Sequence, residues 1–240
     1  MKHQSLAAVL ALTATTGIAP LAHAAEPAKP AENAPEAPAQ ALEPLGPKLG
    51  EKAPDATVAM PDESPIELSS IYDKGPIVLV FFRGEWCPYC TKHIKQWQTM
   101  VDEVAAQRGY IIGITPDRPG NMEQIFERNV PTFQILHDFN GQAAKNFNLQ
   151  FTLPLDLQEK YKGYGVNLAA RNWDGTWNLP HPATIIIDSE GIVRYVHAEQ
   201  DYTKRADPTE ALEVLKTIEK ERAAKPKQLA PEGTGTNSGK

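Results

Sequence analysis

A Cys-x-x-Cys motif separates a short apolar run from an amphipathic segment, and this arrangement restricts the possible folds more than any other feature. Residues 77–82 form an unbroken apolar run, typical of a strand buried on both faces, and residues 110–115 form a second. Between them, residues 88–108 predict a helix that ends at Gly109. Its apolar side is formed by Ile94, Trp97, Val101 and Val104. The stretch therefore predicts a βαβ unit.

The two cysteines lie where the first strand gives way to this helix. Their spacing lets the sulfurs of Cys87 and Cys90 close a small ring across the first helical turn. We expect free N–H groups and the helix dipole to lower the Cys87 pKa below about 8.5, with Pro88 costing no hydrogen bond. Cys90 is expected to be more buried and to act as the resolving thiol. A purely structural disulfide is the alternative, but closing so short a loop gains little stability.

The remaining domain alternates short elements of both kinds. We expect helices at residues 121–128, 142–147 and 208–222, and strands at residues 133–136, 183–187 and 192–197. The turn-forming residues 188–191 predict that the last two strands form a hairpin. Residues 151–179 fit no such pattern. We interpret them as an inserted surface loop with a helical stretch at 155–161, and long loops are often functional.

The ends of the chain are expected to lie outside the domain. Residues 1–24 show the positive start, apolar run and small-residue site of a cleaved signal peptide, with an uncleaved anchor as the alternative. Residues 25–47 predict an Ala/Pro/Glu-rich linker and residues 225–240 a disordered tail, which leaves 48–224 as the domain. We therefore expect a periplasmic protein that is not inserted in the membrane after cleavage.

Charge and cysteine content exclude several classes of function. The 240 residues include 24 Lys and Arg against 30 Asp and Glu, a net charge of −6. The broad positive field that nucleic-acid binding requires is therefore missing. Two cysteines can form neither a four-thiolate zinc site nor a disulfide-rich scaffold. No glycine-rich phosphate loop is found, and we expect neither a cofactor nor a metal.

Several short motifs recur together in one known family. They are the run Phe82 to Cys90, Phe151 to Pro154, Leu179 to Thr184 with Ile187-Asp188, Asp201 to Thr203, and Arg205 to Pro208. Together they resemble a peroxiredoxin-like subgroup of the alkyl hydroperoxide reductase/thiol-specific antioxidant family, within the thioredoxin superfamily. The resemblance implies a thioredoxin-like α/β fold, with a central mixed sheet flanked by helices and an added N-terminal β-hairpin near residues 54–56 and 66–68. It also implies that Pro182 is the cis-proline that faces the cysteines in such proteins.

The chain departs from this family at the residues that activate peroxide. Typical members carry a Pro and a Thr or Ser ahead of the peroxidatic Cys, and an Arg on a facing strand. Aligned on Cys90, these positions hold Arg83, Cys87 and Pro182. Arg83 therefore has two interpretations: it brings positive charge to the thiolate, or it pairs with Glu85 or Asp117 at the surface.

Three further side chains are expected to line the site. Trp86 and Tyr89 flank the cysteines, and Trp86 is expected to shield them. His181 precedes Pro182, where it either adds positive charge near the thiolate or bonds to the backbone. His93 lies one helical turn after Cys90, so a Cys-Cys-His copper site is conceivable, but we expect His93 to be solvated.

These inferences predict an exported thiol oxidoreductase that cycles Cys87 and Cys90 between dithiol and disulfide. The pairing of Cys87 with Pro182 follows the thioredoxin pattern, which favours protein disulfides as substrates and a protein redox partner, with slower reduction of hydroperoxides. A dedicated thiol peroxidase is the alternative, and a copper-binding chaperone is a remote one.

Overall fold

The computed structural model describes residues 44–72, 74–122 and 131–225. The expected signal peptide, most of the linker, almost all of the tail and most of the expected helix at 121–128 lie outside these ranges. Elements of the first half are β1 (Thr57–Ala59), β2 (Pro65–Glu67), α1 (Ser69–Tyr72), β3 (Ile77–Phe81), α2 (Pro88–Gln98), α3 (Val101–Ala106), β4 (Tyr110–Thr115) and η1 (Pro119–Asn121). Elements of the second half are β5 (Gln134–His137), α5 (Gln142–Asn146), β6 (Gln150–Thr152), α6 (Leu155–Gly163), α7 (Leu168–Arg171), β7 (Asn178–Pro180), β8 (Ala183–Ile187), β9 (Val193–Ala198) and α8 (Pro208–Ala224).

A mixed sheet with the strand order β2-β1-β5-β4-β3-β8-β9 organises the domain. The central strand β3 pairs in parallel with β4 and antiparallel with β8. The expected βαβ unit and the β8–β9 hairpin are both present. Strands β1 and β2 pair antiparallel at one edge, which confirms the added N-terminal hairpin. The thioredoxin-like arrangement is therefore confirmed.

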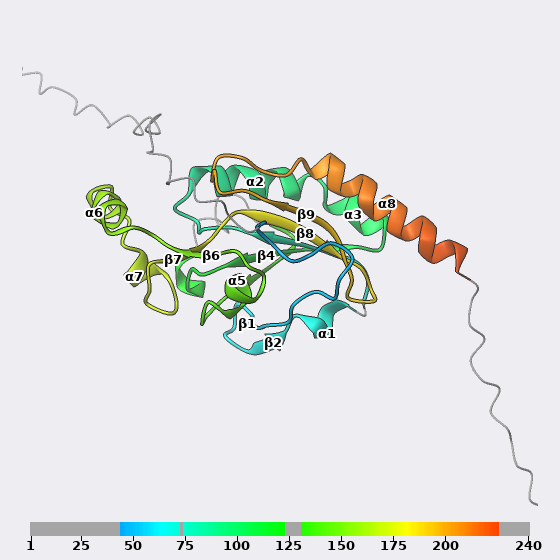
Figure 1. Cartoon of the computed structure of the whole chain (residues 1–240), viewed down its shortest axis with the longest axis horizontal. Coiled ribbons are helices and arrows are strands. Elements are labelled where there is room, and N and C mark those ends of the chain that lie inside the picture. The colour runs from blue at the N-terminus through cyan, green and yellow to red at the C-terminus, as the bar shows by residue number, and fades with distance from the viewer. Residues whose placement is uncertain (1–43, 73, 123–130, 226–240) are drawn as a thin grey trace, which may run out of the picture. The chain divides into compact units, whose positions relative to one another are not determined.

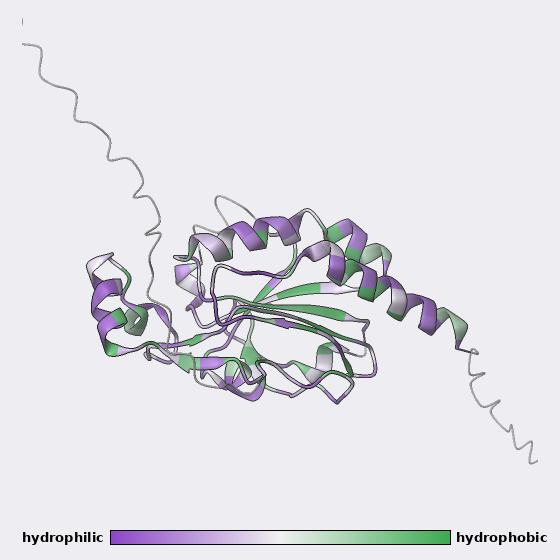
Figure 2. Ribbon diagram, turned by 45° about the horizontal axis from the view of Figure 1, so that its top comes forward, coloured by the Kyte–Doolittle hydropathy of each residue, from purple (hydrophilic) through white to green (hydrophobic). Residues whose placement is uncertain are grey.

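Helices cover both faces of this sheet, as Figure 1 shows, with α2, α3 and α8 on one face and α1 and α5 on the other. Side chains alternate between the faces along β3: Val78 and Val80 pack toward α2 and α8, while Leu79 and Phe81 pack toward α1 and α5. The strands appear green between largely purple outer helix surfaces in Figure 2. Among the described residues, no helix is long and apolar enough to cross a membrane.

The expected single helix at 88–108 is wrong in one respect, because it is interrupted. Helix α2 ends at Gln98 and α3 begins at Val101. The Thr99 N–H donates to both the Lys95 and Gln96 carbonyls, and the Thr99 hydroxyl donates to the Gln96 carbonyl at 2.8 Å. These bonds tighten the last turn and compete with continuation of the helix. Sequence periodicity alone did not reveal the break.

The interpretation of residues 151–179 as a surface loop is also wrong in part. Strands β6 and β7 form a separate two-stranded antiparallel ribbon, and the chain between them, residues 153–177, carries α6 and α7. We call residues 153–177 the arm. The expected helical stretch at 155–161 is present as α6. Leu153 and Leu168 of the arm form a small apolar cluster with Leu179 of β7, and Trp86 packs against it.

Candidate active site

The two cysteines occupy the start of α2 as the sequence predicts. Cys87 is the N-cap residue, and its carbonyl accepts the N–H groups of Cys90 at 2.9 Å and Thr91 at 3.1 Å. Pro88 follows in the first turn, where its missing N–H costs no helical hydrogen bond. Both cysteines carry free thiols. The pair is therefore held in a geometry suited to closing a disulfide across one helical turn.

Cys87 is almost as inaccessible as Cys90, so the expected difference in exposure between the two thiols is very small. Cys87 is 1% exposed and Cys90 is fully buried. Both belong to the apolar cluster between the sheet and α2, together with Phe82 and Ile94, and Trp86 and Tyr89 pack against it. The sulfurs lie beneath these aromatic rings, which restricts access to them.

The expected lowering of the Cys87 pKa is wrong. Its thiol donates a hydrogen bond to Cys90, and this bond and burial raise the pKa of Cys87. The Cys90 backbone N–H and the charge of Arg83 act in the opposite direction, but they do not reverse the shift. Burial also opposes ionisation of Cys90, but the bond from Cys87 and the charges of Arg205 and Arg83 lower its pKa to about 6. The nearby guanidinium charges therefore favour a thiolate at Cys90 over one at Cys87.

Arg205 is a site residue that the sequence analysis named only as part of a motif shared with the family, without assigning it a role. Its Nη2 atom lies 3.5 Å from Cys90 Sγ. Its Nη1 atom donates to the carbonyls of Lys204, at 2.7 Å, and Tyr202, which fixes the guanidinium over the sulfur. Arg205 precedes the N-cap of α8, Asp207, whose side chain accepts the Thr209 N–H. The helix start at 207–208 could have directed attention to the loop before it, although no local pattern points toward Cys90.

Arg83 faces the cysteines and does not pair with a surface acid. It is only 4% exposed, and its Nη2 atom donates to the Tyr161 hydroxyl at 2.8 Å. Its guanidinium carbon lies 4.8 Å from the Trp86 ring centroid and 4.4 Å from that of Tyr202. Tyr89 in turn contacts Tyr202 edge to face. Arg83, Trp86 and Tyr89 thus lie together, as expected, with Tyr161 and Tyr202 as unexpected neighbours.

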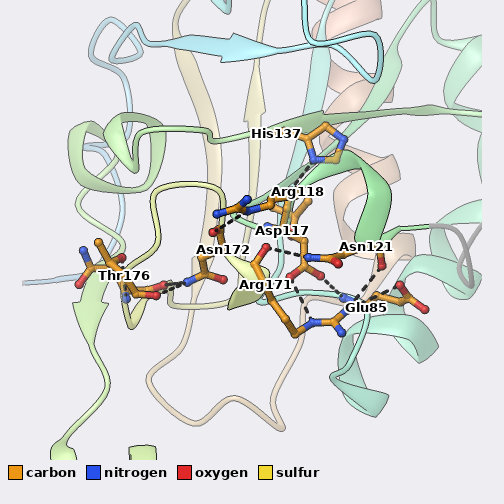
Figure 3. A network of polar contacts seen from close by, with 10 residues as sticks. Glu85, Asp117, Arg118, Asn121, His137, Arg171, Asn172 and Thr176 are labelled. Atoms are coloured by element: carbon orange, nitrogen blue, oxygen red, sulfur yellow. Dashed lines mark hydrogen bonds and ion pairs between the residues drawn. The ribbon is translucent and has the colours of Figure 1, made fainter. Parts of the chain in front are cut away.

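The acids considered for Arg83 bind Arg171 instead (Figure 3). Arg171, at the end of α7, places Nε 3.6 Å from Asp117 Oδ1 and Nη2 3.8 Å from Glu85 Oε2. Asp117 also accepts the Glu85 N–H at 2.9 Å, and the Asp117 carbonyl bonds to His137 Nδ1 at 2.6 Å. This network ties the arm to the loop that precedes the cysteines.

Burial raises the pKa of Asp117 to about 7, even though the charge of Arg171 acts against the shift. Gly84 allows the loop to approach this carboxyl. Its φ is +144°, and an added Cβ would meet Trp86 Nε1 at 2.4 Å and Asp117 Oδ2 at 2.7 Å. The approach of the loop to Asp117 therefore depends on the absence of a side chain at Gly84.

Two expectations at residues 181–182 need correction. The described residues contain no cis peptide bond, so Pro182 is trans. The backbone on both sides of that bond is held in place, because His181 N donates to Leu149 O and Pro182 O accepts from Glu199 N. His181 adds no charge to the thiolate, since burial and then Arg83 lower its pKa to about 4. Its ring stacks on Phe151 at 4.4 Å.

His93 is buried, contrary to the expectation that it is solvated. It is 3% exposed, and its Nε2 atom accepts the Trp97 Nε1–H at 3.1 Å. Burial, followed by the charges of Arg205 and His197, lowers its pKa to about 4. The same Nε2 atom lies 3.3 Å from the Ala206 carbonyl oxygen. Within the described ranges, no three or more His, Cys, Asp or Glu side chains form a group that could hold a metal ion.

Comparisons with known proteins identify relatives that are named as redox proteins. Peroxiredoxin Q of Oryza sativa subsp. japonica, a chloroplast protein, is 23% identical over 169 residues, which cover 70% of this chain and 67% of that protein. Sporulation thiol-disulfide oxidoreductase A of Bacillus subtilis is 26% identical over 98 residues, covering 39% of this chain and 59% of its own. Both names describe thiol-based redox proteins.

Solved structures show the same fold at low sequence identity. Peroxidoxin BcpB from Mycobacterium tuberculosis has a TM-score of 0.57 at 22% identity, and the match covers 72% of this chain and 98% of that one. A peroxiredoxin-like protein from Aquifex aeolicus has a TM-score of 0.57 at 18% identity, covering 73% and 90%. The sequence model of the AhpC/TSA family matches residues 49–196. The chain therefore belongs to the AhpC/TSA family and is a peroxiredoxin-like oxidoreductase.

Proposed function

We propose that this protein reduces small hydroperoxides, with Cys90 as the attacking thiolate and Cys87 as the resolving thiol. The observation that carries the proposal is the position of Arg205 Nη2, 3.5 Å from Cys90 Sγ. A guanidinium there favours the thiolate, and it stabilises negative charge on the oxygen that departs from the attacked peroxide. Arg83 supplies a second buried positive charge at the same pair. The order of the two cysteines is thus the reverse of the sequence-based expectation.

The proposed chemistry uses only the pair and an external reductant. The Cys90 thiolate attacks the terminal oxygen of ROOH, the O–O bond breaks, and RO⁻ leaves and takes up a proton as ROH. Cys90 is then a sulfenic acid. The Cys87 sulfur attacks the Cys90 sulfur, the S–O bond breaks, and water leaves as the disulfide forms. An external dithiol, most simply a protein redox partner, transfers two electrons to restore both thiols.

Burial of the sulfurs favours a small oxidant over a protein disulfide. Exchange requires the attacking sulfur to line up with a disulfide carried on another chain. Cys87 is 1% exposed and Cys90 is fully buried under aromatic side chains, so a bulky disulfide reaches them only after these side chains move. A hydroperoxide of a few atoms needs a much smaller opening.

Protein disulfide exchange is the second candidate function. It is supported by the Cys-Pro-Tyr-Cys sequence at a helix start, and by the likeness to a protein named as a thiol-disulfide oxidoreductase. In that reaction the same pair takes electrons from, or gives them to, a cysteine pair on a partner protein.

Stopped-flow kinetics on the reduced protein separate the two candidates. We expect hydrogen peroxide to react at least roughly a hundredfold faster than with a free thiolate, because one preorganised donor is worth about 10²–10³-fold. We expect a disulfide-bonded protein substrate to react slowly. The surface variant Lys92→Gln on α2 serves as the matched control and should behave as wild type. A peroxide rate equal to that of a free thiolate, with fast exchange, would establish the second candidate in place of the first.

We further propose that residues 1–24 direct export to the periplasm and are removed there. The proposal rests on the charged start, apolar run and small-residue site in the sequence. Expression in a bacterial host followed by fractionation and N-terminal sequencing tests it. A mature N-terminus at Ala25 or Glu26 in the periplasmic fraction is the expected result. Retention in the cytoplasm with an intact first segment would contradict it.

A further inference from the structure

Two guanidinium groups lie beside the cysteines without an acidic partner. Among the described residues, neither Arg83 nor Arg205 forms an ion pair with a carboxylate, whereas Arg171 takes both Glu85 and Asp117. A buried guanidinium without a counter-charge is costly to fold, and its presence at a site calls for a function. One thiolate at Cys90 supplies a single negative charge for the two cations. Asp201 interacts with Arg205, since the charge of Arg205 contributes to lowering the pKa of Asp201, so the positive charge without an acidic neighbour among the described residues is that of Arg83.

Arg83 carries this unmatched charge more clearly than Arg205 does. Arg205 contacts the Cys90 sulfur and two backbone carbonyls. Arg83 is 4% exposed, and its one hydrogen bond among the described residues goes to the Tyr161 hydroxyl. Its Nε atom is buried and has no partner within the described part of the chain, and the same is true of the Arg205 Nε atom, but Arg205 uses its other two nitrogens to contact Cys90 and the backbone. The Arg83 guanidinium therefore has an unused N–H donor beside the reacting sulfurs.

The surroundings of Arg83 fit a small organic anion. Its guanidinium lies over the Trp86 and Tyr202 rings, which hold the fork in one plane and add apolar walls. Planar guanidinium groups match the geometry of a carboxylate. The neighbouring His181 does not compete as a cation, because burial and Arg83 keep it neutral at physiological pH. The aromatic walls suit an organic body attached to the anion.

We propose that Arg83, between Trp86 and Tyr202, binds the carboxylate of the substrate, so that the preferred oxidants are small organic hydroperoxides that carry a carboxylate. This inference rests on the proposed function and specifies its substrate class. The reaction itself is unchanged: the Cys90 thiolate takes the terminal oxygen, the O–O bond breaks, and the carboxylate-bearing alkoxide leaves as the alcohol after protonation. The carboxylate stays bound to Arg83 throughout and is not consumed.

Alkylation tests the carboxylate subsite without any peroxidase chemistry. Iodoacetate and iodoacetamide react with thiolates by the same displacement and differ mainly in the carboxylate. We expect the rate ratio of iodoacetate to iodoacetamide to be at least about tenfold higher for the reduced native protein than for the same protein in urea. Arg83→Gln should lower the ratio to the unfolded value, Arg83→Lys should retain part of it, and Lys92→Gln should leave it unchanged.

Hydroperoxides test the substrate class directly. A hydroperoxide with a free carboxylate should react at least about tenfold faster than its methyl ester in wild type and Lys92→Gln, and equally fast in Arg83→Gln. Equal rates for the acid and the ester in wild type, together with an alkylation ratio equal to that of the unfolded protein, would overturn the carboxylate subsite. If both hydroperoxides were still reduced fast, the proposed function would remain intact. Slow reduction of both with a raised alkylation ratio would keep the subsite and overturn the peroxidase assignment. Because the wild-type ratios are informative alone, a failure of the variants to fold leaves the test valid.

Discussion

Arg205 Nη2 lies 3.5 Å from Cys90 Sγ, although 115 residues separate the two in sequence. The contact predicts that Arg205→Met raises the Cys90 pKa from about 6 by one to two units, because an opposite charge at this distance shifts a pKa by about 1–3 units. Peroxide reduction at neutral pH should fall at least roughly tenfold, from loss of thiolate and of charge stabilisation. Thiolate absorbance as a function of pH measures the first effect. An unchanged titration in Arg205→Met would mean that Arg205 does not stabilise the thiolate.

The roles of the cysteines predict opposite outcomes for two serine variants. Cys87→Ser keeps Cys90 beside Arg205 and removes the resolving thiol, so one equivalent of peroxide should leave a persistent sulfenic acid. Cys90→Ser keeps only the high-pKa thiol, so it should react slowly. Dimedone labelling and intact mass report both. Strong labelling of Cys90→Ser and none of Cys87→Ser would restore Cys87 as the attacking residue.

Arg171 and Asp117 predict a pH-dependent stability. The folded pKa of Asp117, about 7, exceeds its unfolded value of about 3.9, so its burial costs stability as pH rises through this range. Arg171→Gln removes the cation that limits this cost. We expect the free energy of unfolding to fall by about 1–3 kcal/mol at about pH 8, which is less than for a fully buried pair because Arg171 is partly exposed. The fall should be smaller at about pH 5, where Asp117 is protonated. Urea unfolding at both pH values measures it, with Arg171→Lys as the conservative control. An equal loss at both pH values would exclude Asp117 as the cause.

Gly84 predicts a local steric effect that differs from ordinary backbone strain. Gly84→Ala places a Cβ 2.4 Å from Trp86 Nε1 and 2.7 Å from Asp117 Oδ2, so the loop before Cys87 must shift. Gly50 also has a positive φ, of +81°, but has open space around it. Gly50→Ala should therefore cost about 1 kcal/mol, and Gly84→Ala clearly more, with a changed thiolate titration. Thermal unfolding and thiolate absorbance test the pair. Equal costs and unchanged titrations would show that the close contact is relaxed easily.

The central fold could be predicted because its signals are local. The continuous apolar runs at β3 and β4 and the apolar face of α2 each arise from neighbouring residues. The position of Cys87 at the helix start followed from the same pattern. The ribbon of β6 and β7 was missed because its strands have only three residues each and are joined by a long insertion.

The electrostatics of the site could not be predicted in the same way. The order of the cysteine pKa values depends on Arg205, which reaches the site from the loop between β9 and α8. The sequence allowed Arg83 to contact either the cysteines or the acids Glu85 and Asp117. Arg171 at the end of α7 pairs with both acids, and Arg83 faces the cysteines. Burial of His93 likewise depends on how α2 packs, because its polar neighbours in the sequence indicate solvent. Such contacts are set by tertiary packing and leave no periodic signal in the sequence.

The pairing of Phe151 with Leu179 has a consequence for how the arm is joined to the rest of the domain. Because β6 and β7 form a ribbon of their own, the arm begins and ends at adjacent positions outside the seven-stranded sheet. A change in its length or sequence would leave the pairing of β3 with β4 and β8 in place but would disturb the Arg171 network that ties it to the loop before Cys87. Such a change would also replace Tyr161, which bonds to Arg83 at 2.8 Å. The redox pair thus lies on the main sheet and α2, while part of its immediate surroundings comes from the arm.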